Sequence, residues 1–297
     1  MYMIIFLDLF VNICNTYFIM NKMMPVEKNS IYSITARDIS PEGYGIGSVE
    51  NFTVFCPDLL PGETARVLII KVLSSYAIGK LLEITESSPD RILPLCSTYE
   101  QCGGCNLSHM SYEAQLKYKE QHIYDCLKRI GKIEHFTMDP IIPCSADEGY
   151  RNKAQYRFGI RNGHICCGFY RVHSHHLVPT AECKIEAPGT GKIRQKVCEL
   201  SDALGYTVYD EVSHKGLLRS LLIRTSHLTG KSMAIMVING KSLPNEKDFT
   251  QKLTEICPEI CSLYINVNVR PGNTVLGNDF RKLWGEDKLR DSIGKAV

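Results

Sequence analysis

The chain has 297 residues, of which 44% are hydrophobic and 22% are charged, a composition typical of a folded globular protein that excludes a disordered chain. This length is sufficient for two or three domains. The formal net charge of +2 excludes a protein that is basic overall, so any binding of nucleic acid must come from a local basic surface.

The N-terminal segment, residues 1–27, is strongly apolar. It has no basic residue at its start and no small-residue cleavage site, so we predict no signal peptide. A membrane span needs about 20 nearly uninterrupted apolar residues, and Asp8 argues against one. We interpret residues 1–27 as an apolar extension whose first part precedes the true start at Met23 or Met24.

Short β-rich runs fill residues 28–90. Turn residues, among them Gly43 and Pro61-Gly62, separate these runs at regular spacing, which predicts a small OB-like β-barrel. A helix is predicted further on, with Ser111 as its N-cap and Gly131 at its end. Its apolar face is expected to comprise Tyr112, Leu116, Ile123, Leu127 and Ile130.

Residues 91–290 are predicted to form an α+β domain with an antiparallel sheet. Asn162-Gly163 joins two strand-like runs and is a strong signal for a tight hairpin, and Thr229-Gly230 joins a second pair. Helices are expected around residues 193–204 and 249–257, and a strand follows at "SLYINVN".

Three cysteines, Cys96, Cys102 and Cys105, fall within ten residues in a predicted loop at 96–105. A tetrahedral zinc ion and a cubane iron–sulfur cluster both take four ligands, and Cys183 is the candidate for the fourth. The spacing of the cysteines is compatible with either a zinc ion or an iron–sulfur cluster. Three buried thiols without metal are a further alternative, which the Gly103-Gly104 pair disfavours because it indicates a loop wrapped closely around an ion.

Several motifs are shared with a known family. The run "PLCSTYEQCGGCNLSHMSYEAQLKYKEQHI" resembles the cluster motif of the RNA uracil-5-methyltransferases that act on 23S ribosomal RNA. Residues 28–90 resemble a TRAM domain, and "YRNKAQYRFG" and "GFYRVHSHHLVPTAEC" resemble the family's central domain. The resemblance covers roughly residues 28–297.

This resemblance implies a 4Fe-4S cluster held by Cys96, Cys102, Cys105 and Cys183. It also implies a multidomain α+β fold in which a TRAM barrel and a central domain precede a Rossmann-like methyltransferase domain that binds S-adenosylmethionine. We expect that last domain to be missing, with residues 291–297 as its start. The chain is therefore expected to hold no catalytic residue and to be inactive alone.

The expected partner is RNA, of ribosomal origin on the family resemblance. Five basic residues are the candidate phosphate contacts: Arg151, Lys153, Arg157, Arg161 and Arg171. Tyr44, Phe52 and Phe55 are candidates for base stacking, although aromatic side chains in small barrels mostly fill the interior. Thirteen cysteines indicate a reducing compartment, so we expect a cytoplasmic monomer without membrane contact. An iron–sulfur redox protein and a zinc-binding structural module are the alternative functions.

Overall fold

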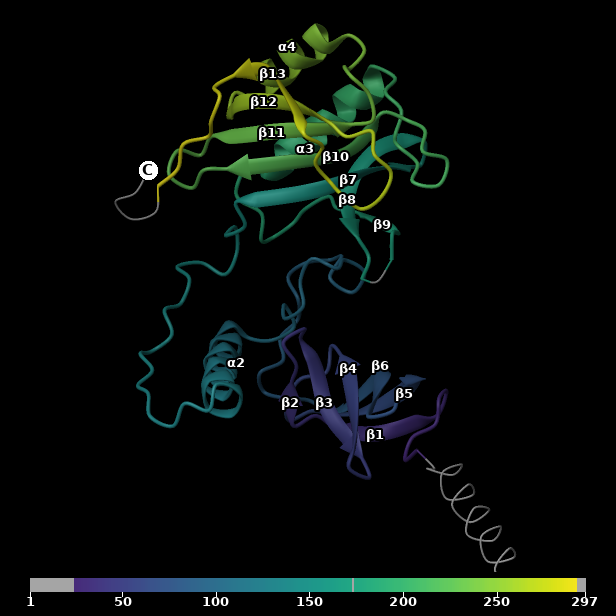
Figure 1. The fold of residues 1–297 in the computed structure, drawn as a ribbon, viewed down its shortest axis with the longest axis vertical. Helices are drawn as coiled ribbons and strands as arrows, with labels where there is room; N and C mark the ends of the chain where they lie inside the picture. Colours follow the sequence, from purple (N-terminus) through teal and green to yellow (C-terminus); the bar gives the residue numbers. More distant parts are fainter. Residues whose placement is uncertain (1–23, 173, 293–297) are drawn as a thin grey trace, which may run out of the picture. The chain divides into compact units, whose positions relative to one another are not determined.

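The computed structural model describes residues 24–172 and 174–292 (Figure 1). These residues divide into two compact units. The first unit contains the described residues up to Leu93 together with His109–Met138, and the second contains Pro94–Ser108 and the residues from Asp139 onward. The N-terminal extension expected at residues 1–27 lies, up to residue 23, outside the described residues, as do residues 293–297.

The first unit is built on a six-stranded sheet in the order β1-β5-β6-β4-β3-β2. Neighbouring strands are antiparallel except β4 and β6, which are parallel. The strands are β1 (Ile31–Thr35), β2 (Asp38–Ile39), β3 (Tyr44–Val49), β4 (Phe52–Pro57), β5 (Thr64–Val72) and β6 (Tyr76–Glu86).

The sheet curls so that β3 lies against β1. A Cβ atom on Gly47 of β3 would come within 2.3 Å of the Ile34 side chain and 2.8 Å of the Thr35 carbonyl oxygen. Only glycine permits so close an approach. The alternating inward residues, such as Val54, Val67 and Ile69, are fully buried and form the core of this unit. The predicted succession of short strands between residues 30 and 85 is confirmed.

Helix α2 (Tyr112–Asp125) follows, and a π-helical turn, η1 (Cys126–Ile130), extends it to Gly131. Ser111 caps it as predicted, because its hydroxyl accepts a hydrogen bond from the Ala114 amide at 3.3 Å. The predicted apolar face is confirmed only in part, because Tyr112, Leu116 and Leu127 are half-buried. Only Ala114 of α2 is buried, and Ile123 and Ile130 are 51% and 79% exposed. Helical periodicity identifies a stripe but not whether another element covers it.

A buried ion pair connects the barrel to the chain that enters the cysteine loop. The Glu63 carboxylate is fully buried and accepts hydrogen bonds from Arg91 Nε at 2.6 Å and Nη2 at 2.8 Å. It also accepts bonds from the Leu60 and Ser88 amides. The Arg91 guanidinium also donates a hydrogen bond to the Asp58 carbonyl, at 2.6 Å.

Backbone hydrogen bonds beside the Glu63–Arg91 pair hold the two ends of the cysteine loop together. Arg91 forms an isolated antiparallel bridge with Met110, and the Ile92 amide donates to the His109 carbonyl at 3.0 Å. The Ser111 amide donates to the Asp90 carbonyl at 2.8 Å. The chain between residues 92 and 109 therefore leaves and returns at one point, directly beside the Glu63–Arg91 pair.

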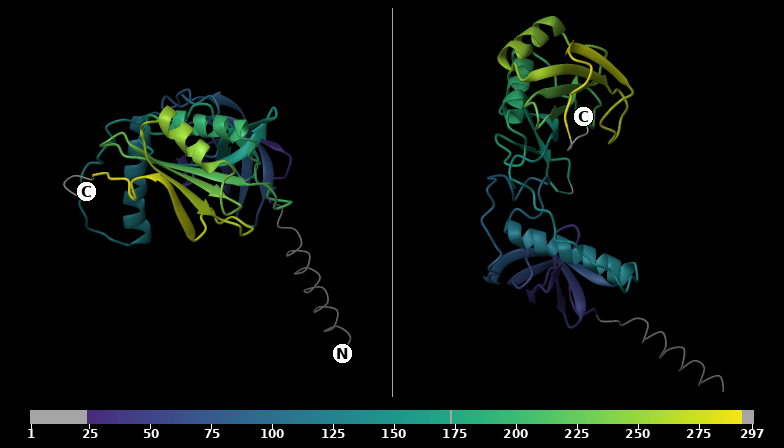
Figure 2. Two further views of the ribbon diagram at one scale, coloured as in Figure 1. Left: turned by 90° about the horizontal axis from the view of Figure 1, so that it is seen from above. Right: turned by 90° about the vertical axis from the view of Figure 1, so that its left-hand side faces the viewer.

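The second unit contains a seven-stranded sheet in the order β13-β12-β11-β10-β7-β8-β9. Helices α3 (Thr190–Ala203) and α4 (Glu246–Ile256) lie on the same face of this sheet, over the main core (Figure 2). The strands are β7 (Lys153–Arg161), β8 (His164–Tyr170), β9 (Leu177–Pro179), β10 (Leu218–Thr225), β11 (Ser232–Ile238), β12 (Ile260–Val267) and β13 (Asp279–Gly285).

The expected antiparallel sheet is wrong at one position, because β11 and β12 pair in parallel. Helix α4 connects them, and a helical crossover is the usual connection between parallel neighbours. The sheet is therefore mixed. The two predicted hairpins are confirmed: Asn162 and Gly163, with φ of 52° and 82°, join β7 to β8, and Gly230, with φ of 65°, lies between β10 and β11.

Gly168 of β8 is expected to be essential for the edge of this sheet. A Cβ atom there would lie 2.0 Å from the Val178 carbonyl oxygen of β9. Replacing Gly168 with Ala should separate β9 from β8 and lower the free energy of unfolding of this unit by about 1–3 kcal/mol, the usual cost of overpacking. Urea denaturation measures it. Gly191→Ala is the matched control, because its nearest neighbour lies at 3.6 Å; an equal effect of both changes would contradict the argument.

No helix within the described ranges is long and apolar enough to cross a membrane.

Candidate metal centre and nucleic-acid interface

The four predicted cysteine ligands line one small cavity in the second unit. Cys96, Cys102 and Cys105 come from the loop before Ser108, and Cys183 comes from the segment between β9 and α3. The cavity has a volume of about 20 Å³, enough for one water molecule. The structure thus brings together thiols that are 78 residues apart in the sequence, from Cys105 to Cys183.

Two of these thiols, Cys102 and Cys183, have raised pKa values, mainly because they are buried. Burial raises the pKa of Cys183 to about 11, and the nearby Glu186 carboxylate adds to the shift. Burial also raises the pKa of Cys102, with further contributions from Cys105 and Cys96. Thiolates this close repel one another, so a cation between them would stabilise the deprotonated forms.

Backbone contacts hold the cysteine loop against the second unit. The Gly103 amide donates to the Tyr170 carbonyl at 3.1 Å, and a Cβ atom on Gly103 would lie only 3.0 Å from that oxygen. Arg151 Nη2 donates to the Gly104 carbonyl at 3.3 Å. The Arg151 amide in turn donates to the Ile185 carbonyl at 2.7 Å, close to Cys183 in sequence. Arg151 therefore connects both ligand segments.

A buried guanidinium holds the chain on both sides of Cys183. Arg194 of α3 is 3% exposed and donates to the Ala181 carbonyl at 2.8 Å. Its Nη1 donates to both oxygens of Glu186 at 3.1 Å. The guanidinium also lies 4.9 Å from the centre of the Tyr156 ring. Neither Arg194 nor Glu186 was evident from the sequence as a buried residue, because Arg and Glu side chains are almost never fully buried unless they are paired.

The thiols surround the cavity but do not meet at one point. No group of three or more His, Cys, Asp or Glu side chains within the described part of the chain is arranged to hold a single metal ion. A tetrahedral zinc ion, with Zn–S bonds of about 2.3 Å, would need sulfurs roughly 3.8 Å apart. Four cysteines around one cavity fit the donor set of an iron–sulfur cluster, which is larger than one ion.

Five thiols outside this cavity have raised pKa values, for which burial is the main cause. A buried thiol is a poor nucleophile, because the thiolate is the reactive form. These residues are Cys56, Cys166, Cys167, Cys257 and Cys261.

The candidate RNA-contacting residues are distributed along one strand and its neighbour. Lys153 and Arg161 lie at opposite ends of β7, roughly 26 Å apart at about 3.3 Å per residue. Both are exposed, as is Arg171 just after β8. Arg157 is half-buried; it donates to the Ser220 hydroxyl at 3.2 Å and packs on the Tyr170 ring. The fifth candidate, Arg151, lies instead beside the cysteine cavity.

The three aromatic candidates of the barrel, Tyr44, Phe52 and Phe55, are each half-buried. Phe52 packs against the barrel core. Phe55 makes an edge-to-face contact with Tyr76, with ring centres 5.3 Å apart. Phe55 thus keeps part of its ring at the surface beside a second aromatic residue.

Comparisons with known proteins find one matching domain model and several similar proteins. Residues 25–82 match the model of the TRAM domain. An uncharacterised RNA methyltransferase of Halalkalibacterium halodurans is 38% identical over 91% of this chain and 59% of its own length. One from Clostridium tetani is 38% identical over 93% and 60%, and one from Staphylococcus aureus is 33% identical over 91% and 60%.

One solved structure shows the fold. The crystal structure of the Pyrococcus abyssi tRNA (uracil-54, C5)-methyltransferase in complex with S-adenosyl-L-homocysteine aligns with 88% of this chain and 57% of its own, with a TM-score of 0.64 and 21% identity. This match contradicts the expected fold class, a multidomain α+β protein with its Rossmann-like methyltransferase domain missing. Nearly the whole described chain aligns with a methyltransferase, and the expected truncation finds no support in it.

The chain is therefore similar to RNA methyltransferases over about nine-tenths of its own length and carries a TRAM domain, and it spans about three-fifths of the length of these curated relatives.

Proposed function

We propose that this protein is an S-adenosylmethionine-dependent RNA (uracil-5-)-methyltransferase acting on 23S ribosomal RNA. The similarity to RNA methyltransferases supports this proposal most strongly, because it runs through both structural units and not through the TRAM domain alone. The solved neighbour is named as a uracil-C5 methyltransferase and was crystallised with the product of the methyl donor. We also propose that the protein is a cytoplasmic monomer.

Methylation at carbon 5 of uracil requires three chemical steps. A thiolate adds to carbon 6, the electron-rich carbon 5 takes the methyl group from the sulfonium donor, and a base removes the carbon 5 proton, which expels the thiolate from carbon 6 and restores the double bond. The residues described here supply RNA binding. The barrel is of a class that binds single strands by stacking and backbone contacts, and Lys153, Arg157, Arg161 and Arg171 provide positive charge in the second unit.

A direct assay tests the proposed reaction. Methyl transfer from radiolabelled S-adenosylmethionine is measured with 23S ribosomal RNA and with transfer RNA transcripts, followed by nucleoside analysis. We expect 5-methyluridine in ribosomal RNA and none in transfer RNA. Methylation of transfer RNA alone would contradict the ribosomal substrate, and a methylated base other than uracil would contradict the reaction.

Cys96, Cys102, Cys105 and Cys183 are proposed to hold a 4Fe-4S cluster. Such a cluster, when bound, supplies a covalent link between the loop at 96–105 and the segment after β9, and metal binding of this kind stabilises the fold. The common cavity and the residue type of all four ligands support this assignment.

Replacing Cys183 with Ser should abolish iron binding and lower the thermal stability of the second unit. The cluster would then have no ligand from the segment after β9, and the loop at 96–105 would lose its link to that segment. Iron, sulfide and zinc are measured on protein purified without oxygen, together with the visible absorption spectrum. Cys126→Ser is the control, because Cys126 lies at the end of α2 in the first unit. Unchanged iron content in Cys183→Ser would contradict the assignment, and stoichiometric zinc in the unaltered protein would replace the cluster by a zinc site.

A further inference from the structure

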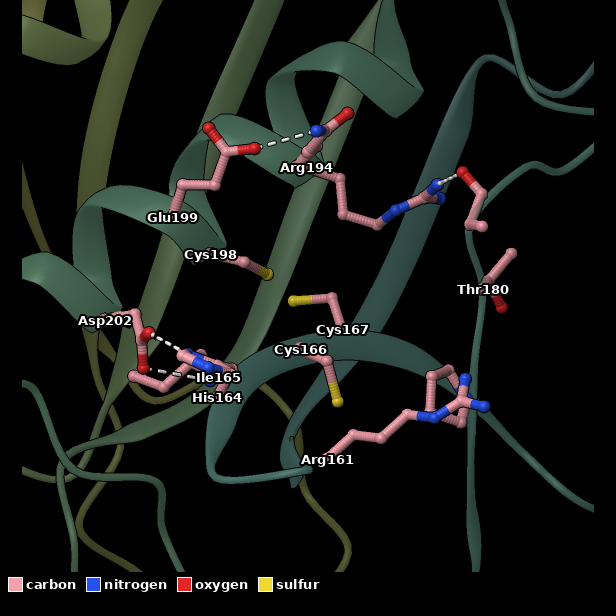
Figure 3. A pocket seen from close by; sticks show the side chains of 13 residues that line it. Arg161, His164, Ile165, Cys166, Cys167, Thr180, Arg194, Cys198, Glu199 and Asp202 are labelled. Atoms are coloured by element: carbon pink, nitrogen blue, oxygen red, sulfur yellow. Dashed lines mark hydrogen bonds and ion pairs between the residues drawn. The ribbon is translucent and has the colours of Figure 1, made fainter.

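The second unit holds a second pocket (Figure 3). Its volume is about 490 Å³, within the range of about 300–1,000 Å³ of sites that enclose small organic ligands. The strands β7, β8 and the segment after β9 form one side, and helix α3 forms the other. Thr180 lines both this pocket and the cysteine cavity, so the two share a wall.

The interior of this pocket is mostly apolar. Ile165, Pro179 and Ala181 line it together with Cys166, Cys167 and Cys198. In Figure 3 the Cys167 and Cys198 sulfurs point toward one another across the β8–α3 interface, and Cys166 points away from them. Such a surface suits a flat, weakly polar group.

Among the charged side chains that the structure describes around the pocket, Arg161 is the one that can bind an anionic ligand. The Asp202 carboxylate binds the His164 ring at 2.7 Å and the Ile165 amide at 3.1 Å. Glu199 binds Lys196 at 2.7 Å, and Arg194 binds Glu186. Arg161 is exposed at the rim, and within the described residues no carboxylate forms an ion pair with it. Each acidic group thus has a hydrogen-bonding partner, whereas the Arg161 guanidinium has no carboxylate partner among the described residues.

We propose that this pocket takes one nucleotide of a bound single-stranded RNA, with the base inside the pocket and its phosphate on Arg161. An apolar interior with one guanidinium at its rim matches a planar base joined to an anion, and guanidinium groups bind phosphate oxygens in a bidentate manner. This inference rests on the proposed RNA substrate. It goes beyond that proposal by assigning a binding site to one flanking nucleotide, beside the cysteine cavity. The basic residues alone do not indicate such a site.

Alkylation of the pocket cysteine tests the occupancy directly. Cys166 is half-buried in the pocket wall and burial raises its pKa, whereas Cys144 is exposed outside the pocket, so N-ethylmaleimide at alkaline pH should modify Cys166 slowly and Cys144 rapidly in the free protein. A short oligouridylate at about ten times its Kd should slow modification of Cys166 by about tenfold and leave Cys144 unchanged. Mass spectrometry of the two peptides measures the rates. Uridine monophosphate and inorganic phosphate are run in parallel to separate an RNA site from a site for free nucleotide.

Two variants identify the residue that binds the phosphate. Arg161→Glu should remove the protection of Cys166 by oligouridylate, and Arg161→Lys should restore part of it because the charge returns. Arg224→Glu is the matched control, since Arg224 is also an exposed arginine of the second unit but does not line the pocket, and protection should persist. Equal loss of protection in both charge reversals would contradict a specific role for Arg161.

A filled pocket provides an independent measurement. Cys166→Phe should weaken oligouridylate binding about tenfold by fluorescence anisotropy, whereas Cys144→Phe should not. If the protein binds oligouridylate and Cys166 stays fully reactive, this inference fails and the proposed function stands. If no RNA of any kind binds, both fail. Protection by uridine monophosphate but not by oligouridylate would assign the pocket to a free nucleotide and overturn the RNA site.

Discussion

Replacing Arg194 with methionine is expected to lower the free energy of unfolding of the second unit by about 3–5 kcal/mol, because it leaves the Glu186 carboxylate buried without its partner. Both side chains of the pair are almost fully buried, at 4% and 3% exposure. The same change removes the hydrogen bond to the Ala181 carbonyl, so the segment around Cys183 loses its contacts with Arg194 on both sides of the cysteine.

The single tryptophan, Trp284, lies in β13 of the second unit and reports its unfolding in urea by fluorescence. Lys196→Met is the control, since Lys196 lies on the same helix in an exposed pair with Glu199, and such pairs contribute about 0–1 kcal/mol. Changing Arg194 and Glu186 together to methionine should restore much of the loss, because buried ion pairs often exchange for apolar residues at little cost. A single variant as stable as the control would contradict the assigned role.

Replacing Glu63 with alanine is expected to destabilise the first unit by about 3 kcal/mol. The change leaves the Leu60 and Ser88 amides and the Arg91 guanidinium without their acceptor in a buried site. Arg91 retains 22% exposure, which places the effect at the lower end of the range for buried pairs. Glu83→Ala is the control, because its pair with Arg66 is exposed on both sides.

The contribution of Glu63 to the free energy of unfolding of the first unit should also depend on pH. Burial by itself raises the pKa of this carboxyl, but hydrogen bonds from Arg91 and from the Leu60 and Ser88 amides outweigh it, and the pKa is lowered. A lowered pKa in the folded state gives stability that is present above the unfolded value of about 4.3 and is lost as pH falls through the folded value. Chemical denaturation followed by circular dichroism at several pH values from neutral to acid measures it. The pH dependence in this acid range should be smaller in Glu63→Ala, and an unchanged dependence would exclude Glu63 as its source.

Local structure was largely predictable because its causes are local. The Asn162-Gly163 turn needs two positive φ angles, which these residues adopt readily. The Ser111 cap needs only its own hydroxyl and the amide three residues later. The placement of α2 followed from its cap and its end at Gly131, whereas the buried side of α2 did not follow, because burial depends on which element packs against the helix.

Other features depend on which strands become neighbours. The parallel pairing of β11 and β12 was not evident, since the same short apolar runs fit either direction of pairing. The pocket behind Arg161 was not evident either, because its walls come from β7, β8, the segment after β9 and α3. Nothing in the local sequence distinguishes Arg161 at its rim from the exposed Arg171.

The sequence by itself determined the order of the elements, the turns between them and the position of three cysteines in a loop, because each depends on residues within about ten positions. Only the tertiary structure decided that Cys183 lies at the same cavity and that Arg194 is buried against Glu186. Both follow from the packing of α3 on the mixed sheet, which brings together residues distant in sequence. Burial then converts charged side chains that would otherwise be solvated into the contacts that position the cysteine ligands.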